Sequence, residues 1–349
     1  MSETKYQTEK LMQYKSEEVW FPLSEDILGW DYDFHRLMLN DYIRMVKYEA
    51  AIKEVVKPGM IVLDIGVGTG ILSMWALEAG AKKVYGIDVN KTIIEKATAR
   101  IKEAGFLEKF QTFNALSNDV SLPEKVDVII SEILGNLGDN EDMTPILNDA
   151  RKRFLKETGQ MIPRKVNTFL VPVSSTNAHG QISNGKCKGI NEKYNLSDLL
   201  LKLEMTNKFN LYYDVVLPKS TYLSSPQMVA DFEFIGLDKG EYQSEIVFTI
   251  DKQGIFNGFK GYFIAKLSDG VLLDISGDDI QNHETSDCWK HCFLPIEKTL
   301  EVHKGDKVKI IFSRRYPKIR NSPFRQCYSW QGDIERDGKN IFIFSQKMC

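Results

Sequence analysis

The stretch VLDIGVGTG, Val62 to Gly70, decides the fold, because a short β-forming run leads directly into glycines at three alternate positions. Glycine carries no Cβ atom, so a glycine-rich turn can bend tightly and let a ligand approach the backbone closely. Such a turn is typical of the junction between the first strand and first helix of a ligand-binding α/β sheet. We therefore expect Asp64, Gly66, Gly68 and Gly70 to lie in a binding site.

Outward from this turn, the apolar residues from Met38 to about Gln160 alternate between helical spacing and short β-rich runs. This is the pattern of βαβ units around a parallel sheet. We expect a doubly wound, Rossmann-like domain over residues 38–162. The expected strands are 60–65, 84–88, 110–114 and 126–131, and the expected helices are 38–50, 71–79 and 91–105.

After Pro163 the apolar pattern changes to a period of two, as in VADFEF, EIVFTI, GYFIAKL and DKVKIIF. Alternation of this kind predicts strands with one buried face. Residues 163–349 are therefore expected to form a mostly antiparallel β-barrel domain, with a sandwich as the alternative. A polar, Gly-rich excursion within 176–212 leads into a short helix capped by Ser197 or Asp198, and this region is the candidate arm for a partner subunit.

The bulk composition excludes several classes of protein. With 349 residues, 43% hydrophobic, 27% charged and a formal net charge of −3, the chain shows no sign of disorder or of a surface for nucleic acid. No apolar stretch approaches the roughly 20 residues of a membrane helix, and the first residues lack the apolar core of a secretory signal. The expected location is cytoplasmic, with no membrane partner.

The five cysteines are few, odd in number and unevenly spaced, which favours free thiols in a reducing compartment over a disulfide framework. The segment CWKHC, Cys288 to Cys292, contains a histidine and raises the alternative of a zinc site. A second ligand pair of recognisable spacing is missing from the sequence, so structural cysteines are favoured and no metal is expected.

A second polar turn, SEILGNLGDNED from Ser131 to Asp142, follows the apolar run VDVII and carries Glu132 and Glu141. Two carboxylates can bind a planar guanidinium from different sides, because this cation has five N–H donors that point in different directions in one plane. Repulsion between them should raise one pKa until a cation arrives. The alternative is an exposed acidic loop, but Glu132 directly follows a strand whose carboxyl end should border the ligand.

Asp88 ends the second expected strand, where the hydroxyls of a ribose would need an acceptor. The pattern D-x-G-x-G-x-G followed by an acid resembles the S-adenosylmethionine pocket of class I methyltransferases. Its third glycine comes four residues after the first, whereas the G-x-G-x-x-G pattern of dinucleotide sites has a spacing of five. A nicotinamide site and a tight turn without a ligand are the alternatives.

From about Trp30 to Trp330 the chain resembles the protein arginine methyltransferase family. SEILGNLGDNED is similar to the family's double-glutamate loop, especially in the form found in the symmetric-dimethylating branch. The resemblance implies that Glu132 and Glu141 bind and activate a guanidino nitrogen of arginine in a protein or peptide. S-adenosyl-L-methionine is the implied methyl donor.

Further segments extend the resemblance. HRLMLNDYIRMVKYEAAI is similar to the family's cofactor-covering helix, which implies that Arg44 contacts the donor's carboxylate and that Met38 lines the acceptor pocket. TSDCWKHCFLPIEK resembles a β-barrel segment of the symmetric branch, so Trp289 matches an aromatic residue that stacks on the substrate guanidinium. Leu116 and Ser117 match the pair that faces the adenine.

Three departures leave parts of this implication open. Cys288 stands where many members have the histidine of a Thr-His-Trp loop, and Leu116 replaces an acid, so it can only pack on the base. Met38 resembles the asymmetric-dimethylating enzymes while the acidic loop resembles the symmetric ones, so the two cues to the product disagree. Alternative functions are methylation of free arginine or another small guanidino compound, and a non-catalytic scaffold. The family resemblance also implies a homodimer, and residues 1–37 are expected to cover the cofactor in part.

Overall fold

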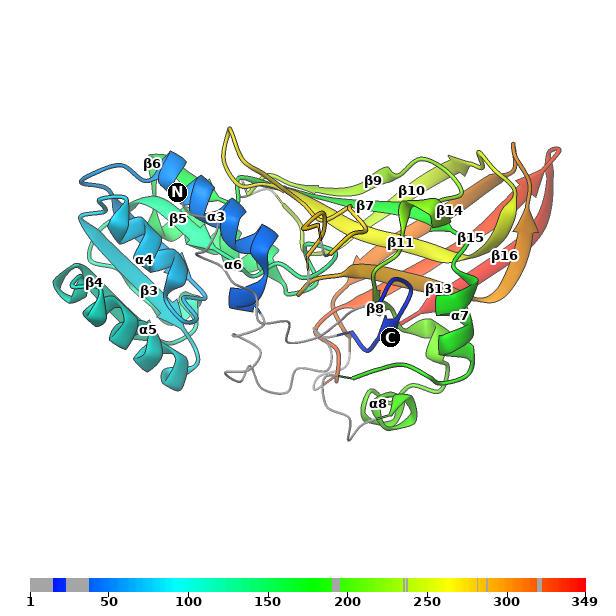
Figure 1. Cartoon of the computed structure of the whole chain (residues 1–349), viewed down its shortest axis with the longest axis horizontal. Helices are drawn as coiled ribbons and strands as arrows, with labels where there is room; N and C mark the ends of the chain where they lie inside the picture. Colours follow the sequence, from blue (N-terminus) through cyan, green and yellow to red (C-terminus); the bar gives the residue numbers. More distant parts are fainter. Residues whose placement is uncertain are drawn as a thin grey trace.

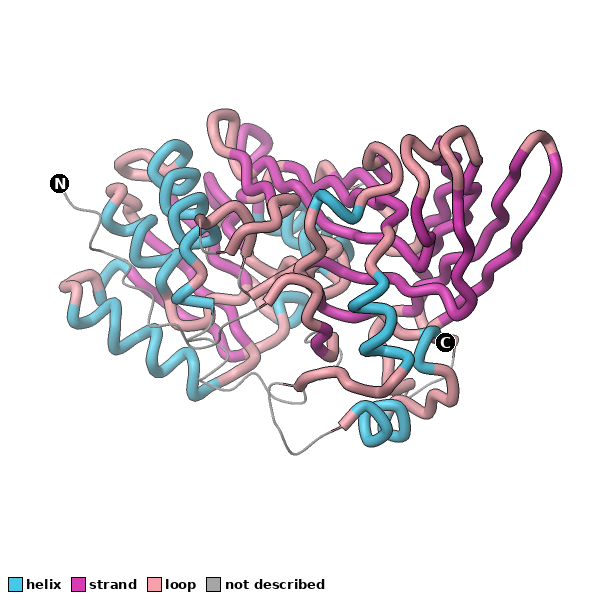
Figure 2. The backbone as a smooth tube through the Cα atoms, turned by 45° about the vertical axis from the view of Figure 1, so that its right-hand side comes forward, coloured by secondary structure: helices cyan, strands magenta, loops and turns pink. Residues whose placement is uncertain are grey.

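The structure is a computed structural model that describes residues 15–22, 38–189, 195–234, 236, 238–280, 282–286, 288–318 and 322–349. A parallel sheet with helices lies beside a larger antiparallel part, as the two ends of the molecule in Figures 1 and 2 show. The expected combination of an α/β half with an antiparallel β half is confirmed.

The α/β half contains five strands, and its helices follow the expected alternation. The elements in chain order are α3 (Tyr42–Val55), β2 (Ile61–Ile65), α4 (Ile71–Glu78), β3 (Lys83–Asp88), α5 (Lys91–Glu103), β4 (Phe110–Asn114), β5 (Val126–Ser131), α6 (Met143–Phe154) and β6 (Leu155–Ile162). Two short 3₁₀ helices, η1 (Leu107–Lys109) and η2 (Ser117–Asp119), flank β4.

The strand order of this sheet is β4-β3-β2-β5-β6, and all of its neighbouring strands are parallel. The order reverses between β2 and β5, so the connections that leave these two strands run to opposite sides. Open α/β sheets bind ligands at the carboxyl ends of the strands at such a point. The glycine turn after β2 and the acidic loop after β5 both begin there.

Local sequence explains where the helices begin. The side chain of Asp41 accepts the Arg44 backbone N–H at the start of α3, and Asn90 caps α5 in the same way through Ile93. Gly70, in the left-handed conformation with φ of 78°, precedes α4. The buried face of α3 then follows helical spacing, with Met45, Tyr48, Ala51, Ile52 and Val55 turned into the core.

The antiparallel half forms two sheets. Its elements are β1 (Val19–Trp20), β7 (Lys165–Val173), α7 (Thr176–Ser183), α8 (Leu196–Lys202), η3 (Lys208–Asn210), β8 (Tyr213–Val215), η4 (Lys219–Thr221), β9 (Gln227–Phe232), β10 (Tyr242–Thr249), β11 (Gly254–Lys266), β12 (Leu272–Asp274), β13 (His291–Val302), β14 (Lys307–Arg315), β15 (Cys327–Arg336) and β16 (Lys339–Lys347). One sheet has the order β1-β8-β13-β11-β7-β9 with β12 beside β11, and the other has the order β10-β14-β15-β16.

Two hydrophobic cores hold these layers together. The first surrounds the parallel sheet and continues into the antiparallel half through residues such as Phe232, Phe263 and Trp289. The second fills the space between the two antiparallel sheets, where Phe259 contacts the rings of Phe248 and Phe344. The two halves are therefore joined by continuous hydrophobic packing, which restricts their movement relative to each other.

Two local expectations need correction or fall partly outside the structure. The helix α8 is capped by Asn195 and not by Ser197 or Asp198, because Asp198 lies at the third helical position and completes a capping box. Of residues 1–37, the structure describes only 15–22, where β1 pairs with β8 of the antiparallel half. The expected cover over the cofactor otherwise lies outside the described residues.

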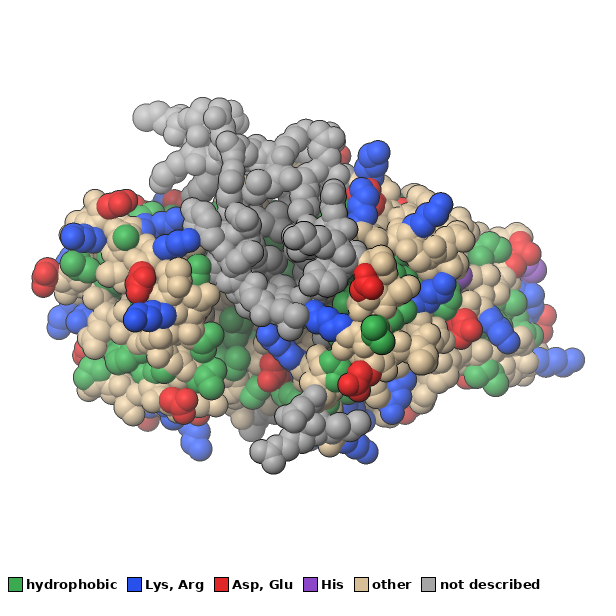
Figure 3. Space-filling view, turned by 90° about the horizontal axis from the view of Figure 1, so that it is seen from below, with side chains coloured by type: hydrophobic (Ala, Val, Ile, Leu, Met, Phe, Trp, Pro, Cys, Tyr) green, Lys and Arg blue, Asp and Glu red, His purple; other side chains and the backbone are tan. Residues whose placement is uncertain are grey.

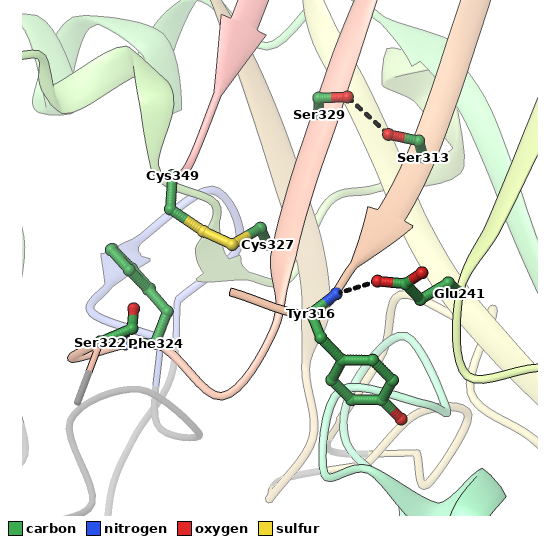
Figure 4. The surroundings of a disulfide bond; sticks show 8 residues. All are labelled: Glu241, Ser313, Tyr316, Ser322, Phe324, Cys327, Ser329 and Cys349. Carbon is green, nitrogen blue, oxygen red and sulfur yellow. Dashed lines mark hydrogen bonds between the residues drawn. A yellow bond between two sulfur atoms is a disulfide. The ribbon is translucent and has the colours of Figure 1, made fainter. Parts of the chain in front are cut away.

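The expectation of free thiols is wrong for one pair, because Cys327 and Cys349 form a disulfide (Figure 4). Strands β15 and β16 form an antiparallel pair, which returns the end of the chain to the start of β15. The two Cα atoms lie 5.5 Å apart, a normal distance for a disulfide. The sequence could not reveal this pairing, because it depends on the register of the two strands. Cys187, Cys288 and Cys292 are free thiols.

The surface agrees with the ordinary composition. On the face shown in Figure 3, basic and acidic side chains are interspersed over both halves and do not form a patch of one sign. None of the helices in the described ranges is long and apolar enough to span a membrane.

Replacing Phe259 by alanine tests the core between the antiparallel sheets. Its side chain is fully buried among aromatic rings from three strands, so we expect the free energy of unfolding to fall by about 3–5 kcal/mol. Urea denaturation would measure this loss. The control is Ile343→Ala, because Ile343 is 73% exposed and should change the same quantity by less than about 0.5 kcal/mol. Equal losses in the two variants would contradict the assignment of this core.

Candidate functional site

A cavity of about 800 Å³ lies at the carboxyl ends of the parallel strands, a volume typical of small-molecule sites. Its walls come from the start of α3, the turns after β2 and β3, the acidic loop after β5, and residues just before β13 and β15. Ten of the twelve residues singled out from the sequence line it: Met38, Arg44, Gly66, Gly68, Asp88, Leu116, Ser117, Glu132, Glu141 and Trp289.

Asp64 and Gly70 lie behind this wall. The Ser73 hydroxyl donates to one carboxylate oxygen of Asp64 at 2.6 Å, while the other oxygen has no hydrogen-bond partner among the described residues. Burial raises the pKa of Asp64 to about 7, against the opposing effect of the Ser73 hydrogen bond. A Cβ atom added to Gly70 would lie 2.9 Å from that of Ala97, so this glycine allows α4 and α5 to approach closely.

Hydrogen bonds connect the glycine turn after β2 to Asp88, the last residue of β3. Gly66 and Gly68 have φ values of 74° and 51°, a region that glycine adopts without strain. The Gly68 N–H donates to one carboxylate oxygen of Asp88 at 2.9 Å, and the Asn90 N–H donates to the other at 2.9 Å. Since a carboxylate accepts about four hydrogen bonds, Asp88 retains capacity for a ligand.

Glu132 is already engaged by a cation of the chain itself. The Arg44 Nε atom donates to its Oε2 atom at 2.7 Å, a second nitrogen of the guanidinium pairs with the same oxygen, and the Leu134 N–H donates to Oε1 at 3.3 Å. Burial alone would lower the pKa of Arg44, but the charge and hydrogen bond of Glu132 together with the electrostatic effects of Cys288 and Tyr48 outweigh it, so the pKa rises. Arg44, for which the resemblance implies a contact with the donor's carboxylate, thus lies on the first glutamate in this structure.

Glu141 is the open carboxylate of the pair. Within the described residues it has no hydrogen bond or ion pair, and it is only partly shielded from the cavity. Burial, and then the charge of Glu132, raise the pKa of Glu141 to about 8, while Arg325 and Arg44 oppose the rise. The expectation that repulsion raises one of the two pKa values therefore agrees with this site, although burial contributes more than repulsion.

The acidic loop between the two glutamates is held by its own amide side chains. The Asn140 Oδ1 atom accepts the Leu137 N–H at 3.0 Å, and its Nδ2 atom donates to Asn136 Oδ1 at 3.0 Å. A Cβ atom on Gly135 would collide with the Asn140 side chain, so only glycine fits there. The Gly/Asn composition of the loop thus serves its compact shape.

The antiparallel half holds the same loop from outside. Arg314 of β14 donates to Asp142 at 2.9 Å and lies beside Asp139, which also accepts the Tyr328 hydroxyl at 2.8 Å. The Gln326 amide donates to the Asn140 carbonyl at 2.8 Å. These contacts fix the backbone on both sides of Glu141.

A single carboxylate, Asp41, connects α3 to the segment before β13. Its Oδ1 atom accepts the Arg44 N–H at 3.0 Å, while Oδ2 accepts the Cys288 N–H at 3.1 Å and the hydroxyl of Ser286. The next residue, Trp289, donates its indole N–H to the Leu134 carbonyl. Its ring packs edge-on against Phe263 at a centroid distance of 5.0 Å. These contacts therefore fix the start of α3, the acidic loop and the indole of Trp289 relative to one another.

The remaining predicted residues mark the two ends of the cavity. The Met38 carbonyl accepts from Arg44 at 3.1 Å, beside the glutamates. Leu116 is 61% exposed, and the neighbouring Ser117 accepts from Arg153 through its carbonyl at 2.6 Å. An exposed apolar side chain in a cavity wall suits contact with a flat ring of a ligand.

The CWKHC segment does not converge on a metal. His291 accepts the Leu217 N–H through Nδ1 at 2.9 Å, and its Nε2 atom lies 2.9 Å from the Ile275 carbonyl. Burial lowers the pKa of His291 well below its usual value, so the ring is neutral. In the part of the chain that the structure describes, no three His, Cys, Asp or Glu side chains are placed to hold a metal.

Sequence analysis missed the residues that support the site from a distance in the chain. Asp41, Asp214, Arg314 and Arg325 were not singled out, and no local pattern distinguishes them from ordinary surface charges. The signal that could have flagged Arg314 is its place in an apolar strand run, IIFSRRY, where a charge facing inward needs a partner.

Two protein-family models match consecutive parts of the chain. Ribosomal protein L11 methyltransferase (PrmA) matches residues 49–162, and the PRMT5 oligomerisation domain matches residues 165–321.

Two relatives of known name are protein arginine N-methyltransferases. The chain is 28% identical over 327 residues to ribosomal protein arginine N-methyltransferase rmt3 of Schizosaccharomyces pombe, which covers 89% of this chain and 58% of the relative. It is 39% identical over 140 residues to protein arginine N-methyltransferase PRMT10 of Arabidopsis thaliana, which covers 40% of this chain and 36% of the relative. The chain thus spans less than two thirds of the length of these relatives.

Two solved structures share the fold. One is the Trypanosoma brucei PRMT1 enzyme-prozyme heterotetrameric complex with AdoHcy, and the other is Arabidopsis thaliana protein arginine methyltransferase 10 in an open conformation. Each has a TM-score of 0.75 and 22% sequence identity, over 91% of this chain and 98% of the solved chain. The two family models, the named relatives and this shared fold agree with the double-glutamate loop beside a glycine turn, and by these comparisons the chain is similar to the protein arginine methyltransferase family.

Proposed function

We propose that this chain transfers a methyl group from S-adenosyl-L-methionine to a guanidino nitrogen of arginine in a protein or peptide. The observation that supports this most is one continuous cavity, with the glycine turn and Asp88 among its walls together with Glu132 and Glu141. In this proposal, the nucleoside of the donor and the cation of the acceptor bind in the same cavity, as methyl transfer between the two molecules requires.

The residues at the nucleoside end fit the donor. Asp88 can accept hydrogen bonds from ribose hydroxyls, the turn at Gly66 and Gly68 allows close approach, and Leu116 offers an apolar surface to the base. When bound, S-adenosyl-L-methionine would supply an electrophilic methyl group on its sulfonium sulfur. Arg44 would bind the donor's carboxylate only by sharing its guanidinium with Glu132.

The two glutamates have different tasks in this proposal. Glu132, held by Arg44 and Leu134, presents a fixed carboxylate edge, while Glu141 is open and takes most of the incoming positive charge. At an effective dielectric near 20, a charge pair 4 Å apart contributes about 4 kcal/mol, which is enough to orient a guanidinium. The two carboxylates draw the positive charge of the guanidinium toward the nitrogens that they contact. The nitrogen that faces the methyl group therefore gains nucleophilic character, and it loses a proton after the transfer.

Several finer features belong to the same proposal. We propose a homodimer that uses residues 176–212 as its arm, a cytoplasmic location, and the two antiparallel sheets as one β-barrel. The domain division at 162/163 and the binding role of Trp289 are part of it. In support, the match to an oligomerisation domain covers residues 165–321, which include this arm. Free arginine as acceptor and a non-catalytic scaffold are the competing functions.

An acceptor screen tests the function directly. The chain is incubated with isotope-labelled donor and with arginine-rich peptides, free arginine or agmatine, and the products are identified by mass spectrometry. We expect label on the guanidino nitrogens of a peptide. Donor binding without label on any acceptor would instead support the scaffold.

Replacing Glu132 by glutamine tests its role in activation. The change keeps the shape but removes the charge, so turnover should fall about a hundredfold or more while donor affinity stays close to that of the wild type. Stopped assays and calorimetry would measure the two quantities. Glu157→Gln, at an exposed position of β6, is the matched control. Unchanged turnover in Glu132→Gln would refute the role.

The pH dependence of kcat/KM should report Glu141. Its carboxyl is neutral below a pKa of about 8, under the combined influence of burial, Glu132, Arg44 and Arg325. The carboxylate form becomes about tenfold more abundant per unit as pH rises toward this value, whereas the acceptor guanidinium stays charged. The rate constant kcat/KM should therefore rise with pH and level off above about 8.

Glu141→Asp keeps a titratable carboxyl and should shift the midpoint of this pH profile, whereas Glu141→Gln should remove the rise along with most of the activity. A wild-type profile that falls as the pH rises through this range would contradict the assignment.

A further inference from the structure

The charged side chains that line the cavity differ in whether they form ion pairs or hydrogen bonds with other residues of the chain. Arg44 pairs with Glu132, Asp88 accepts two backbone N–H groups, and Asp214 accepts from the Asn136 amide at 2.7 Å. Lys91 begins α5, close in sequence to Asp88 at the nucleoside end. Glu141 and Arg325 are left at the other end.

Arg325 lies beside Glu141 because the side chain of the residue after Arg325 binds the backbone of the residue before Glu141. The residue after Arg325, Gln326, donates to the carbonyl of Asn140, the residue before Glu141, at 2.8 Å. Both side chains line the same cavity. Within the described residues, Arg325 has no hydrogen bond or ion pair, although its charge acts on the carboxyl of Glu141. A carboxyl group and a guanidinium, neither of them paired within the described residues, thus stand next to each other.

The backbone that carries Arg325 is firmly placed even though its side chain is exposed. Phe324 and Gln326, on either side, are buried, and the following Cys327 is joined to Cys349 (Figure 4). Tyr328 then reaches Asp139 of the acidic loop. Because the anchors surround one exposed position, the backbone at Arg325 is held at the rim of the cavity while its guanidinium can adjust to a bound molecule.

We infer that Arg325 selects acceptors that carry a carboxylate close to the guanidino group. This inference rests on the proposed function: Glu141 takes the cation of the acceptor, and Arg325 takes an anion of the same molecule in a charge-assisted hydrogen bond. The acceptor chemistry is that of free arginine, or of arginine next to an acidic residue in a peptide. An acceptor surrounded by further cations meets repulsion from Arg325, which disfavours it.

A different role for the same residue predicts a different result. If Arg325 served only to balance the charge of Glu141, its loss would change activity on every acceptor by the same factor. If it binds the acceptor, its loss changes the ratio between acceptors that differ only in a carboxylate. The ratio of kcat/KM values is therefore the measurement that separates the two.

The experiment compares the wild type with Arg325→Gln and Arg325→Lys on two matched sets of acceptors. Free arginine and agmatine differ by one carboxylate, and one peptide is made with Asp, Asn or Lys beside its single arginine. Label transfer from the donor gives kcat/KM for each. The two sets distinguish a small-molecule source of the carboxylate from a peptide source. Lys304→Gln, in an exposed turn between β13 and β14, controls for net charge.

We expect the wild type to prefer the carboxylate-bearing member of at least one set by about tenfold, the effect of a charged hydrogen bond. Arg325→Gln should remove that preference, while Arg325→Lys and Lys304→Gln should keep most of it. Equal kcat/KM values for the members of both sets, a wild-type preference for the lysine peptide, or an unchanged ratio in Arg325→Gln would overturn the inference but leave methyl transfer intact. No transfer to any acceptor would overturn the proposed function, and the inference with it.

Discussion

The site depends on the buried contacts of Arg314 with the acidic loop. This arginine is 1% exposed, comes from the antiparallel half, and meets Asp139 and Asp142 of a loop that belongs to the parallel sheet. A buried charge without its partner typically costs about 3–5 kcal/mol, so the two halves cannot shift apart here without a large penalty. Because Glu141 immediately precedes Asp142, the position of the open carboxylate is set by a strand more than 170 residues away in the chain.

The same constraint explains why two chemically identical side chains differ. Glu132 emerges from the end of β5, where the guanidinium of Arg44 reaches it and pairs with it. Glu141 is held on the far side of the loop, where burial and the charge of its twin favour the neutral form. A cation that enters the cavity would offset both unfavourable effects by its attraction to the carboxylates. In the proposed function, the pair would favour a guanidinium through electrostatics before any contact with the rest of the acceptor.

Much of this arrangement follows from patterns in the sequence, and the two exceptions have different causes. The strands 61–65, 83–88, 110–114 and 126–131 lie within one residue of their expected bounds, because apolar runs between glycines and polar turns leave little choice. The cap of α8 and the disulfide of Cys327 with Cys349 were predicted wrongly. The first depends on competition between neighbouring polar residues, and the second depends on strand register, which alternation alone does not specify.

The sequence by itself determined the two kinds of sheet, the glycine turn after the first parallel strand, and the presence of two glutamates nine residues apart. These are local properties, since periodicity and turn chemistry act over a few residues. Only the tertiary structure decided that Arg44 would lie on Glu132, that Arg325 would stand beside Glu141, and that Asp41 would join α3 to the segment carrying Trp289. Charges attract over several ångströms whatever their distance in the chain, so these pairings exist only once the two halves have packed together.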